Sequence, residues 1–168
     1  MMKKSIFAGL FYMFATLSSN AEDMSLSIEI PSLNVAEYHR PYVAAWVQNL
    51  DTKAITNLAV WYQLDKAGEG NKWLKDMRQW WRRSGRNIDM PADGFTGATR
   101  PPGVHQVELK HIADSLPAGS YRLYVEAARE VGGRELLNVE FNWPAEKAQI
   151  FEAQGETELG LVTIKVAP

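Results

Sequence analysis

Short runs in which apolar and polar residues alternate, each bounded by turn signals, constrain the fold of this chain more than any other feature. In the first run, Leu26, Ile28 and Ile30 alternate with polar residues, and Pro31 ends the run. Successive side chains of a strand point to opposite faces, so such a run offers one face to a core. Seven segments either alternate in this way or are rich in aromatic and β-branched residues: Ser25–Ile30, Tyr42–Gln48, Leu58–Leu64, Val104–Leu109, Tyr121–Glu126, Leu137–Trp143 and Val162–Val166. About seven short strands with regular turns predict an all-β fold, an immunoglobulin/fibronectin-like β-sandwich.

One segment, Lys72–Arg83, has a different period. Its apolar residues are spaced i, i+1, i+4, i+7 and i+8, which places them on one face of an α-helix. These residues are Trp73, Leu74, Met77, Trp80 and Trp81. Gly85 follows as the expected C-terminal cap, and Arg82 and Arg83 suit the negative end of the helix dipole. The sequence therefore predicts one amphipathic helix within the sandwich.

The first residues predict export from the cytoplasm. Lys3 and Lys4 precede the mostly apolar stretch Ile6–Leu17, and Ser19-Asn20-Ala21 supplies small residues at a cleavage site. This is the pattern of a signal peptide over residues 1–21, cleaved after Ala21. The alternative is a membrane anchor, but the apolar stretch is shorter than the roughly 20 residues that a spanning helix needs. We therefore expect a soluble periplasmic protein with a single sandwich domain over residues 22–168.

Composition narrows the possible functions. The chain has no cysteine, which excludes disulfides, thiol chemistry and thiolate metal sites. Residues 22–168 hold 16 Lys and Arg against 20 Asp and Glu, a net charge of −4, so we expect no nucleic-acid partner. His39, His105 and His111 lack the spacing of metal ligands, so no metal site is predicted. No local signature indicates a catalytic triad or another catalytic residue.

The charge is unevenly distributed. The region from Lys72 to Arg100 holds seven Lys or Arg and three Asp, a local charge of +4 within an acidic protein. Most of the basic residues lie on the predicted helix or in the loop after it, residues 86–103. A local charge opposite to that of the whole chain requires an explanation.

That loop contains the string Asp93-Gly94-Phe95-Thr96-Gly97-Ala98-Thr99-Arg100. It resembles the covalent flavinylation signal of bacterial FMN-carrying proteins, in which the last threonine is modified. The resemblance implies that a flavin transferase of the ApbE type (an FAD:protein FMN transferase) moves FMN from FAD onto the Thr99 hydroxyl, leaving a phosphoester. A neutral threonine hydroxyl is a poor nucleophile, so the transferase must supply the base and the metal.

The neighbouring residue types suit an acceptor that must enter another protein's active site. Gly97 and Ala98 leave no bulk beside Thr99, and Gly94 allows a tight turn. Thr96 is expected to hydrogen-bond within the turn, and Arg100 to pair with the FMN phosphate through charge-assisted hydrogen bonds. Asp93 is expected to order the loop or to contact the metal of the transferase.

The rest of the chain, from about Leu26 to Val166, resembles one family of predicted periplasmic proteins of unknown function. The matching residues are Lys72–Met77, Trp80-Trp81-Arg82, Thr96–Pro101, Gly119-Ser120-Tyr121, Val125–Glu130 and Leu159-Gly160. This family occurs beside PepSY-type membrane proteins and flavin transferases, which implies a PepSY-type electron partner and a role in ferric reduction or iron uptake. A histidine often precedes the glycine pair in the family. This chain has Val131 before Gly132-Gly133, so no role for that histidine is carried over.

Three alternatives remain at this stage. Trp80 is a candidate to stack on the flavin ring, but the same helix face can instead cover the sandwich and become part of its core. The run from Glu126 to Glu130 offers paired carboxylates around Arg129, which could serve general acid/base catalysis, but these charges are expected to be solvated groups at the end of a strand. The favoured function is a periplasmic electron carrier with covalent FMN. The rivals are a non-redox binding or adaptor module and a stand-alone flavoenzyme.

Overall fold

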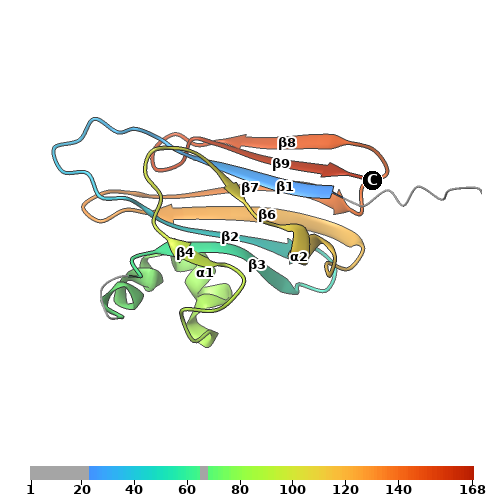
Figure 1. The fold of residues 1–168 in the computed structure, drawn as a ribbon, viewed down its shortest axis with the longest axis horizontal. Coiled ribbons are helices and arrows are strands. Elements are labelled where there is room, and N and C mark those ends of the chain that lie inside the picture. The colour runs from blue at the N-terminus through green and yellow to red at the C-terminus, as the bar shows by residue number, and fades with distance from the viewer. Residues whose placement is uncertain (1–22, 65–67) are drawn as a thin grey trace, which may run out of the picture.

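Two layers of strands, antiparallel except for one pair, dominate the computed structural model, which describes residues 23–64 and 68–168 (Figure 1). The predicted signal peptide and its cleavage site lie outside these residues. Within the described ranges, no helix is long and apolar enough to cross a membrane.

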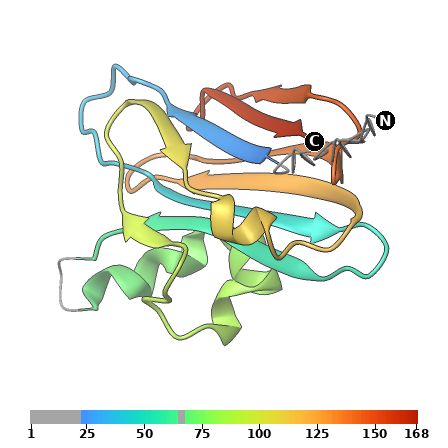
Figure 2. The ribbon, with the colours of Figure 1, turned by 45° about the vertical axis from the view of Figure 1, so that its right-hand side comes forward.

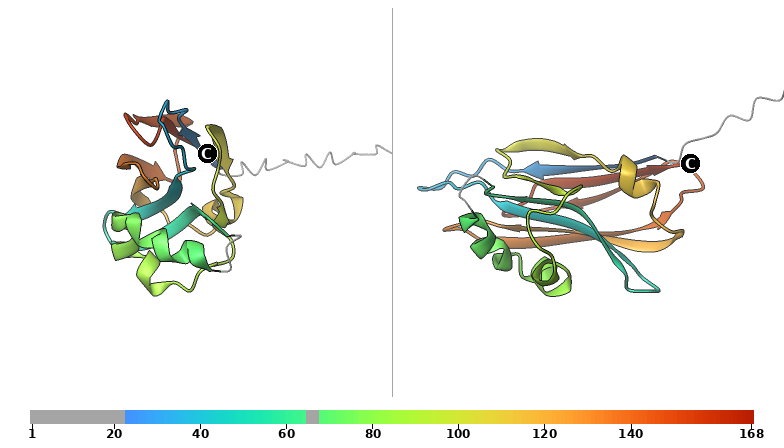
Figure 3. Two further views of the ribbon diagram at one scale, coloured as in Figure 1. Left: turned by 90° about the vertical axis from the view of Figure 1, so that its left-hand side faces the viewer. Right: turned by 60° about the horizontal axis from the view of Figure 1, so that its bottom comes forward.

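The two sheets share nine strands between them. The four-stranded sheet has the order β5-β1-β9-β8, and the five-stranded sheet has the order β4-β3-β2-β6-β7. The strands are β1 (Asp23–Ile30), β2 (Tyr42–Asn49), β3 (Ile55–Tyr62), β4 (Thr96–Ala98), β5 (Gly103–Val107), β6 (Gly119–Ala128), β7 (Arg134–Trp143), β8 (Gln149–Gln154) and β9 (Leu161–Ala167). The end-on view in Figure 3 shows the sheets face to face, with the helical segments outside the five-stranded sheet. The predicted β-sandwich is confirmed.

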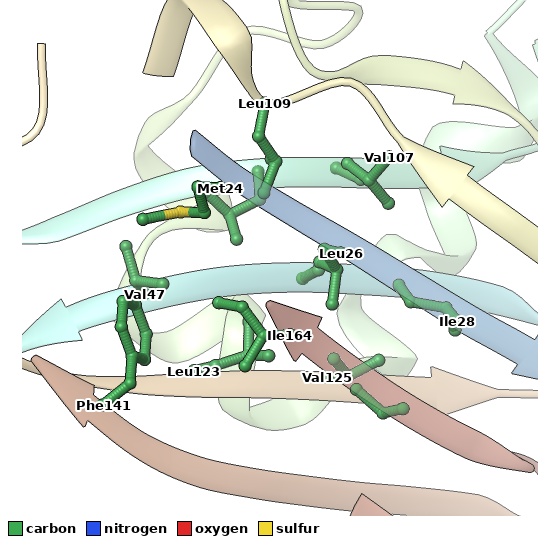
Figure 4. Close-up of a cluster of buried hydrophobic side chains, with 14 of the residues drawn as sticks. Met24, Leu26, Ile28, Val47, Val107, Leu109, Leu123, Val125, Phe141 and Ile164 are labelled. Carbon is green, nitrogen blue, oxygen red and sulfur yellow. The ribbon is translucent and has the colours of Figure 1, made fainter. Parts of the chain in front are cut away.

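The main core lies between the two sheets. Leu26 and Ile28 of β1 face Leu123 and Val125 of β6 across the sandwich, and all four are at most 1% exposed (Figure 4). Burying this apolar surface is the dominant favourable contribution to the stability of a disulfide-free domain.

A second cluster covers the outer face of the five-stranded sheet. Residues of β2, β3 and β6 pack there against η1 (Glu69–Asp76) and α1 (Arg78–Arg83), which lie below the sheet in Figure 2. The members are Tyr42, Ala44, Trp46, Val60, Tyr62, Leu74, Met77, Trp80, Tyr124 and Ala128. Because both faces of β2 are covered, its residues are almost all buried and show no alternation.

The predicted single helix over Lys72–Arg83 is wrong in one respect. The segment is a 3₁₀-helix followed by a short α-helix, and the chain bends at Met77, whose φ is −76° and ψ is 72°. The buried Glu126 carboxylate accepts hydrogen bonds from the Gln79 and Trp80 amides, which lets α1 begin anew after the bend. Gly85 does not cap α1, since it starts the 3₁₀ turn η2 (Gly85–Asn87).

The predicted strand count of about seven is also low. β4 lies within the segment that we expected to be a loop, and β8 follows Trp143-Pro144, where we expected no strand. A last short helix, α2 (Lys110–Ala113), connects β5 to β6.

Candidate functional site

The Thr-Gly-Ala-Thr string is an edge strand of the five-stranded sheet. β4 runs parallel to β3, with Val60 opposite Thr96 and Tyr62 opposite Ala98. The hydrogen bonds between β3 and β4 end with one that the Thr99 amide donates to the Tyr62 carbonyl, 3.2 Å long. One side of β4 is therefore held by the sheet, while its other side pairs with no strand of the described residues. The motif is displayed in an extended conformation.

A tight turn leads into this strand. Gly94 has a φ of +88°, a conformation that side-chain-bearing residues rarely adopt, so the turn requires glycine here. The Thr96 hydroxyl oxygen accepts a 3.0 Å hydrogen bond from the Ala92 amide, as the sequence predicted. Asp93 is exposed at the tip of the turn.

Trp61 lies beneath the middle of the motif. It is 4% exposed, and a Cβ added to Gly97 would stand only 3.2 Å from the Trp61 Cδ1 atom. The Arg100 guanidinium lies over the same indole, 5.4 Å from the ring centre, and His105 meets it edge-on. Gly97 is thus needed because its backbone passes against an aromatic ring.

Thr99 and Arg100 stand at the point where the chain leaves one sheet for the other. Thr99 is partly exposed, and the segment after it crosses to β5 at the edge of the four-stranded sheet (Figure 1). Arg100 is exposed, and it forms no ion pair with any residue in the described ranges. A group on Thr99 would therefore meet a cation that is not neutralised by a neighbouring carboxylate.

Trp80 does not lie at this site. It is fully buried, and its indole nitrogen donates a 2.9 Å hydrogen bond to the Asn57 side chain. A Cβ on Gly85 would fall 2.5 Å from the Trp80 ring, so the following turn packs directly over it. Both faces of this indole are occupied by the protein, and the expectation that it stacks on a flavin does not fit the structure.

A pocket that sequence reasoning missed opens at the end of β3, the strand that pairs with the motif. It encloses about 210 Å³. Its lining combines aromatic, basic and acidic side chains: His39, Arg40, Tyr42, Gln63, Trp73, Asp76, Arg129 and Glu130, with Ala128 and Val131. Gln63 directly follows Tyr62, the residue that receives the Thr99 amide. No local signal could have found this pocket, because its residues come from four separate parts of the chain.

Arg129 is the most unusual residue in the pocket lining. Its side chain is 6% exposed and pairs with the Glu158 carboxylate, 4% exposed, at 2.7 Å. The expected solvation of these strand-end charges is therefore wrong for Arg129, and also for the fully buried Glu126. The Arg129 Nη1 atom is buried and has no hydrogen-bond partner among the described residues.

Tyr38 adds a second unsatisfied group near Arg129. Its ring centre lies 6.0 Å from the guanidinium, and its buried hydroxyl likewise has no partner within residues 23–64 and 68–168. Burial raises the pKa of Tyr38, so this hydroxyl keeps its proton and remains a donor near neutral pH. Buried polar groups of this kind normally have a partner.

The sandwich and the site together define an all-β domain that displays a glycine- and threonine-rich edge strand. A pocket lined by aromatic, basic and acidic side chains opens at the end of the neighbouring strand, β3. Residues 23–161 match the model of a family described as predicted periplasmic protein (DUF2271), and the chain belongs to this family. Its description agrees with the predicted export, and the protein is periplasmic. Neither the curated proteins nor the solved structures contain a match.

Proposed function

We propose that this protein is a periplasmic electron carrier with FMN bound covalently to Thr99. The main support for the proposal is the position of the motif Asp93–Thr99 at an edge of the five-stranded sheet. The motif ends in an extended edge strand, and Thr99 lies where the chain leaves the sheet. A protein substrate must fit an extended segment into its enzyme, and an edge strand is already in that conformation.

The covalent step conserves atoms and electrons. The Thr99 Oγ attacks the phosphorus of FAD that belongs to its FMN half, and an oxygen–phosphorus bond forms. The bond between this phosphorus and the bridging oxygen breaks, and AMP leaves with that oxygen. The hydroxyl proton passes to a base of the ApbE-type transferase, because no described carboxylate or imidazole is bonded to Thr99.

The residues around Thr99 suit the flavinylated protein as well as the unmodified acceptor threonine. Arg100 supplies a positive charge next to the phosphodiester, and its stacking on Trp61 holds the guanidinium at the exit of β4. Gly97 lets the backbone lie close to Trp61, which fixes the strand before the acceptor. FMN, when bound, supplies reversible electron transfer, and the protein supplies attachment, position and local charge.

The partners follow from the family resemblance and belong to the proposal. The transferase loads the protein, and a PepSY-type membrane protein exchanges electrons with it in ferric reduction or iron uptake. Covalent attachment suits the periplasm, where a free cofactor would diffuse away.

The test is co-expression with an active transferase, followed by intact mass and absorbance. Wild-type protein should be yellow and heavier by one FMN, and the flavin should survive denaturation. Thr99→Ala removes the only atom of residue 99 that can form the ester, so this variant should be colourless at the unmodified mass. Thr96→Ala is the matched control: it loses a hydrogen bond worth about 0.5–1.5 kcal/mol but should still be modified.

Two outcomes would contradict the proposal. Flavin that remains on Thr99→Ala after denaturation would show that another residue is the acceptor. Colourless wild-type protein beside a transferase that modifies a known substrate would refute the carrier function and favour a non-redox binding or adaptor module.

A further inference from the structure

We propose that the pocket beside Gln63 receives the isoalloxazine ring of the flavin carried by Thr99, with Trp73 against the ring and Arg129 at its polar edge. This inference rests on the proposed function and goes beyond it, because it assigns the ring a binding site that the attachment motif does not provide.

The position of the pocket relative to Thr99 is the first argument. The Thr99 amide is bonded to the carbonyl of Tyr62, and the next residue of that strand, Gln63, lines the pocket. Adjacent strands lie about 4.8 Å apart, so Gln63 places one end of the pocket next to the attachment point, and the lining residues from β2 and β6 lie one and two strands further away. The ribityl chain that separates the phosphate of FMN from its ring is long enough to bridge such a spacing.

The second argument is that one hydrogen-bond donor of the Arg129 side chain has no acceptor. Glu158 occupies its Nε and Nη2 atoms, while Nη1 is buried without a partner among the described residues. A buried guanidinium nitrogen with no acceptor is costly, and a bound group with carbonyl and imine acceptors would satisfy it. The pyrimidine edge of a flavin has such acceptors, and a positive charge there favours the reduced ring.

The exposed aromatic surface at the pocket is the third argument. Trp73 is 54% exposed although it is large and apolar, and the neighbouring Val131 is 73% exposed. Tyr42 adds a second aromatic ring to the lining. A planar, largely apolar ring suits this surface, because it would remove Trp73 from water and could pack against its indole.

The other tryptophan on the helical layer does not offer the same environment. Trp81 lines a groove with Lys75, Arg78, Arg82 and Arg134. Arg134 begins β7, which forms the edge of the five-stranded sheet opposite to β4. Among the described residues, that groove shares no lining residue with the pocket around Trp73 and includes no residue of β3 or β4, which makes Trp81 a matched control.

The experiment compares loaded wild-type protein with Trp73→Leu and Trp81→Leu. Intact mass first verifies one FMN per chain in each sample. An indole in contact with a flavin quenches its fluorescence by electron transfer, so wild-type fluorescence per flavin should be low. Trp73→Leu should raise it several-fold and lower its anisotropy, while Trp81→Leu should leave both unchanged. Equal fluorescence in wild-type and Trp73→Leu protein that both carry FMN would overturn the inference but not the proposed function.

A second variant tests the polar edge. Arg129→Lys keeps a positive charge for Glu158, but it lacks the planar fork in which two nitrogens bond Glu158 while a third stands free for a ring in the pocket. We expect a folded protein whose midpoint potential is more negative than that of wild type. An unchanged potential in folded, loaded Arg129→Lys would overturn the role of Arg129. A wild-type protein that never gains the mass of FMN would overturn this inference together with the proposed function.

Discussion

Contacts of single residues decide how the motif can be displayed. Gly94 is needed for its positive φ, and Gly97 is needed for a different reason, its close approach to Trp61. The two glycines look alike in the sequence, where both were explained by flexibility or lack of bulk. The structure separates them, because only Gly97 has a neighbour that a side chain would meet.

Gly97→Val therefore gives a prediction at the residue scale. The Cβ alone would lie 3.2 Å from the Trp61 Cδ1 atom, and the two methyl groups beyond it would need further space. Overpacking of this kind costs about 1–3 kcal/mol, so both the urea midpoint and the extent of FMN loading should fall.

Ala98→Val is the matched control for Gly97→Val. Ala98 occupies the next position of the same strand and is exposed, and a β-branched residue suits an extended backbone. We expect wild-type stability and loading. If Gly97→Val and Ala98→Val behave alike in urea unfolding, close packing on Trp61 is not what requires glycine.

The site residues differ in how far the sequence could predict them. The Thr96 hydrogen bond within the turn was predictable, because its partner Ala92 lies four residues away. The two alternatives for Trp80 could not be decided, because helical periodicity shows which residues share a face but not what covers that face, and the structure shows that Trp80 is part of the core. The pocket around Trp73 and Arg129 needed the fold, since its residues are brought together by strands that are distant in sequence.

At the element scale, the helical layer depends on one buried carboxylate. Glu126 of β6 is fully buried, accepts hydrogen bonds from the Gln79 and Trp80 amides, and pairs with Arg134 at 2.8 Å. It joins α1 to the five-stranded sheet. The carboxylate also satisfies amides that the bend at Met77 leaves without helical partners.

Glu126→Ala should destabilise the protein strongly. Arg134 is 36% exposed and can be solvated once Glu126 is gone, so the main cost falls on the Gln79 and Trp80 amides, which lose their acceptor. Each buried donor left without a partner costs about 1–3 kcal/mol. Urea unfolding should show this loss, and hydrogen exchange should show faster exchange in α1 than in β1. Glu140→Ala, which removes an exposed partner of Arg122, should cause little change. Similar losses for Glu126→Ala and Glu140→Ala would show that Glu126 does not support the helical layer.

Some strands could be predicted from the sequence and others could not, depending on whether only one of their faces is buried. β1 and β7 were found because one of their faces is buried and the other is not, which produces alternation in the sequence. β4 is three residues long and exists through its parallel pairing with β3, a contact that leaves no local pattern. β8 is an edge strand whose Ile150 is 61% exposed, so its apolar residues do not follow the expected alternation.

At the scale of the whole molecule, the two sheets are joined by carboxylates as well as by the apolar core. Glu135 of β7 accepts hydrogen bonds from the backbone amides of residues 156–159, in the turn between β8 and β9. Glu158 of the same turn pairs with Arg129 at the end of β6. Both contacts connect the five-stranded sheet to the four-stranded one.

The Glu135 contact predicts loss of stability in acid. Burial alone would raise the pKa of Glu135, but hydrogen bonds from four backbone amides outweigh it and hold the pKa below its ordinary value of 4.5. A carboxylate with a depressed pKa in the folded state stabilises that state above the ordinary value, and this contribution is lost as the pH falls below it. Glu135→Gln carries no charge at any pH, so it should melt well below wild type at pH 7, and the two melting temperatures should converge in acid. Glu140→Gln, an exposed change on the same strand, controls for the loss of a negative charge and should show no such convergence. A difference between wild type and Glu135→Gln that stays constant from neutral pH into acid would mean that the charge of Glu135 does not hold the two sheets together.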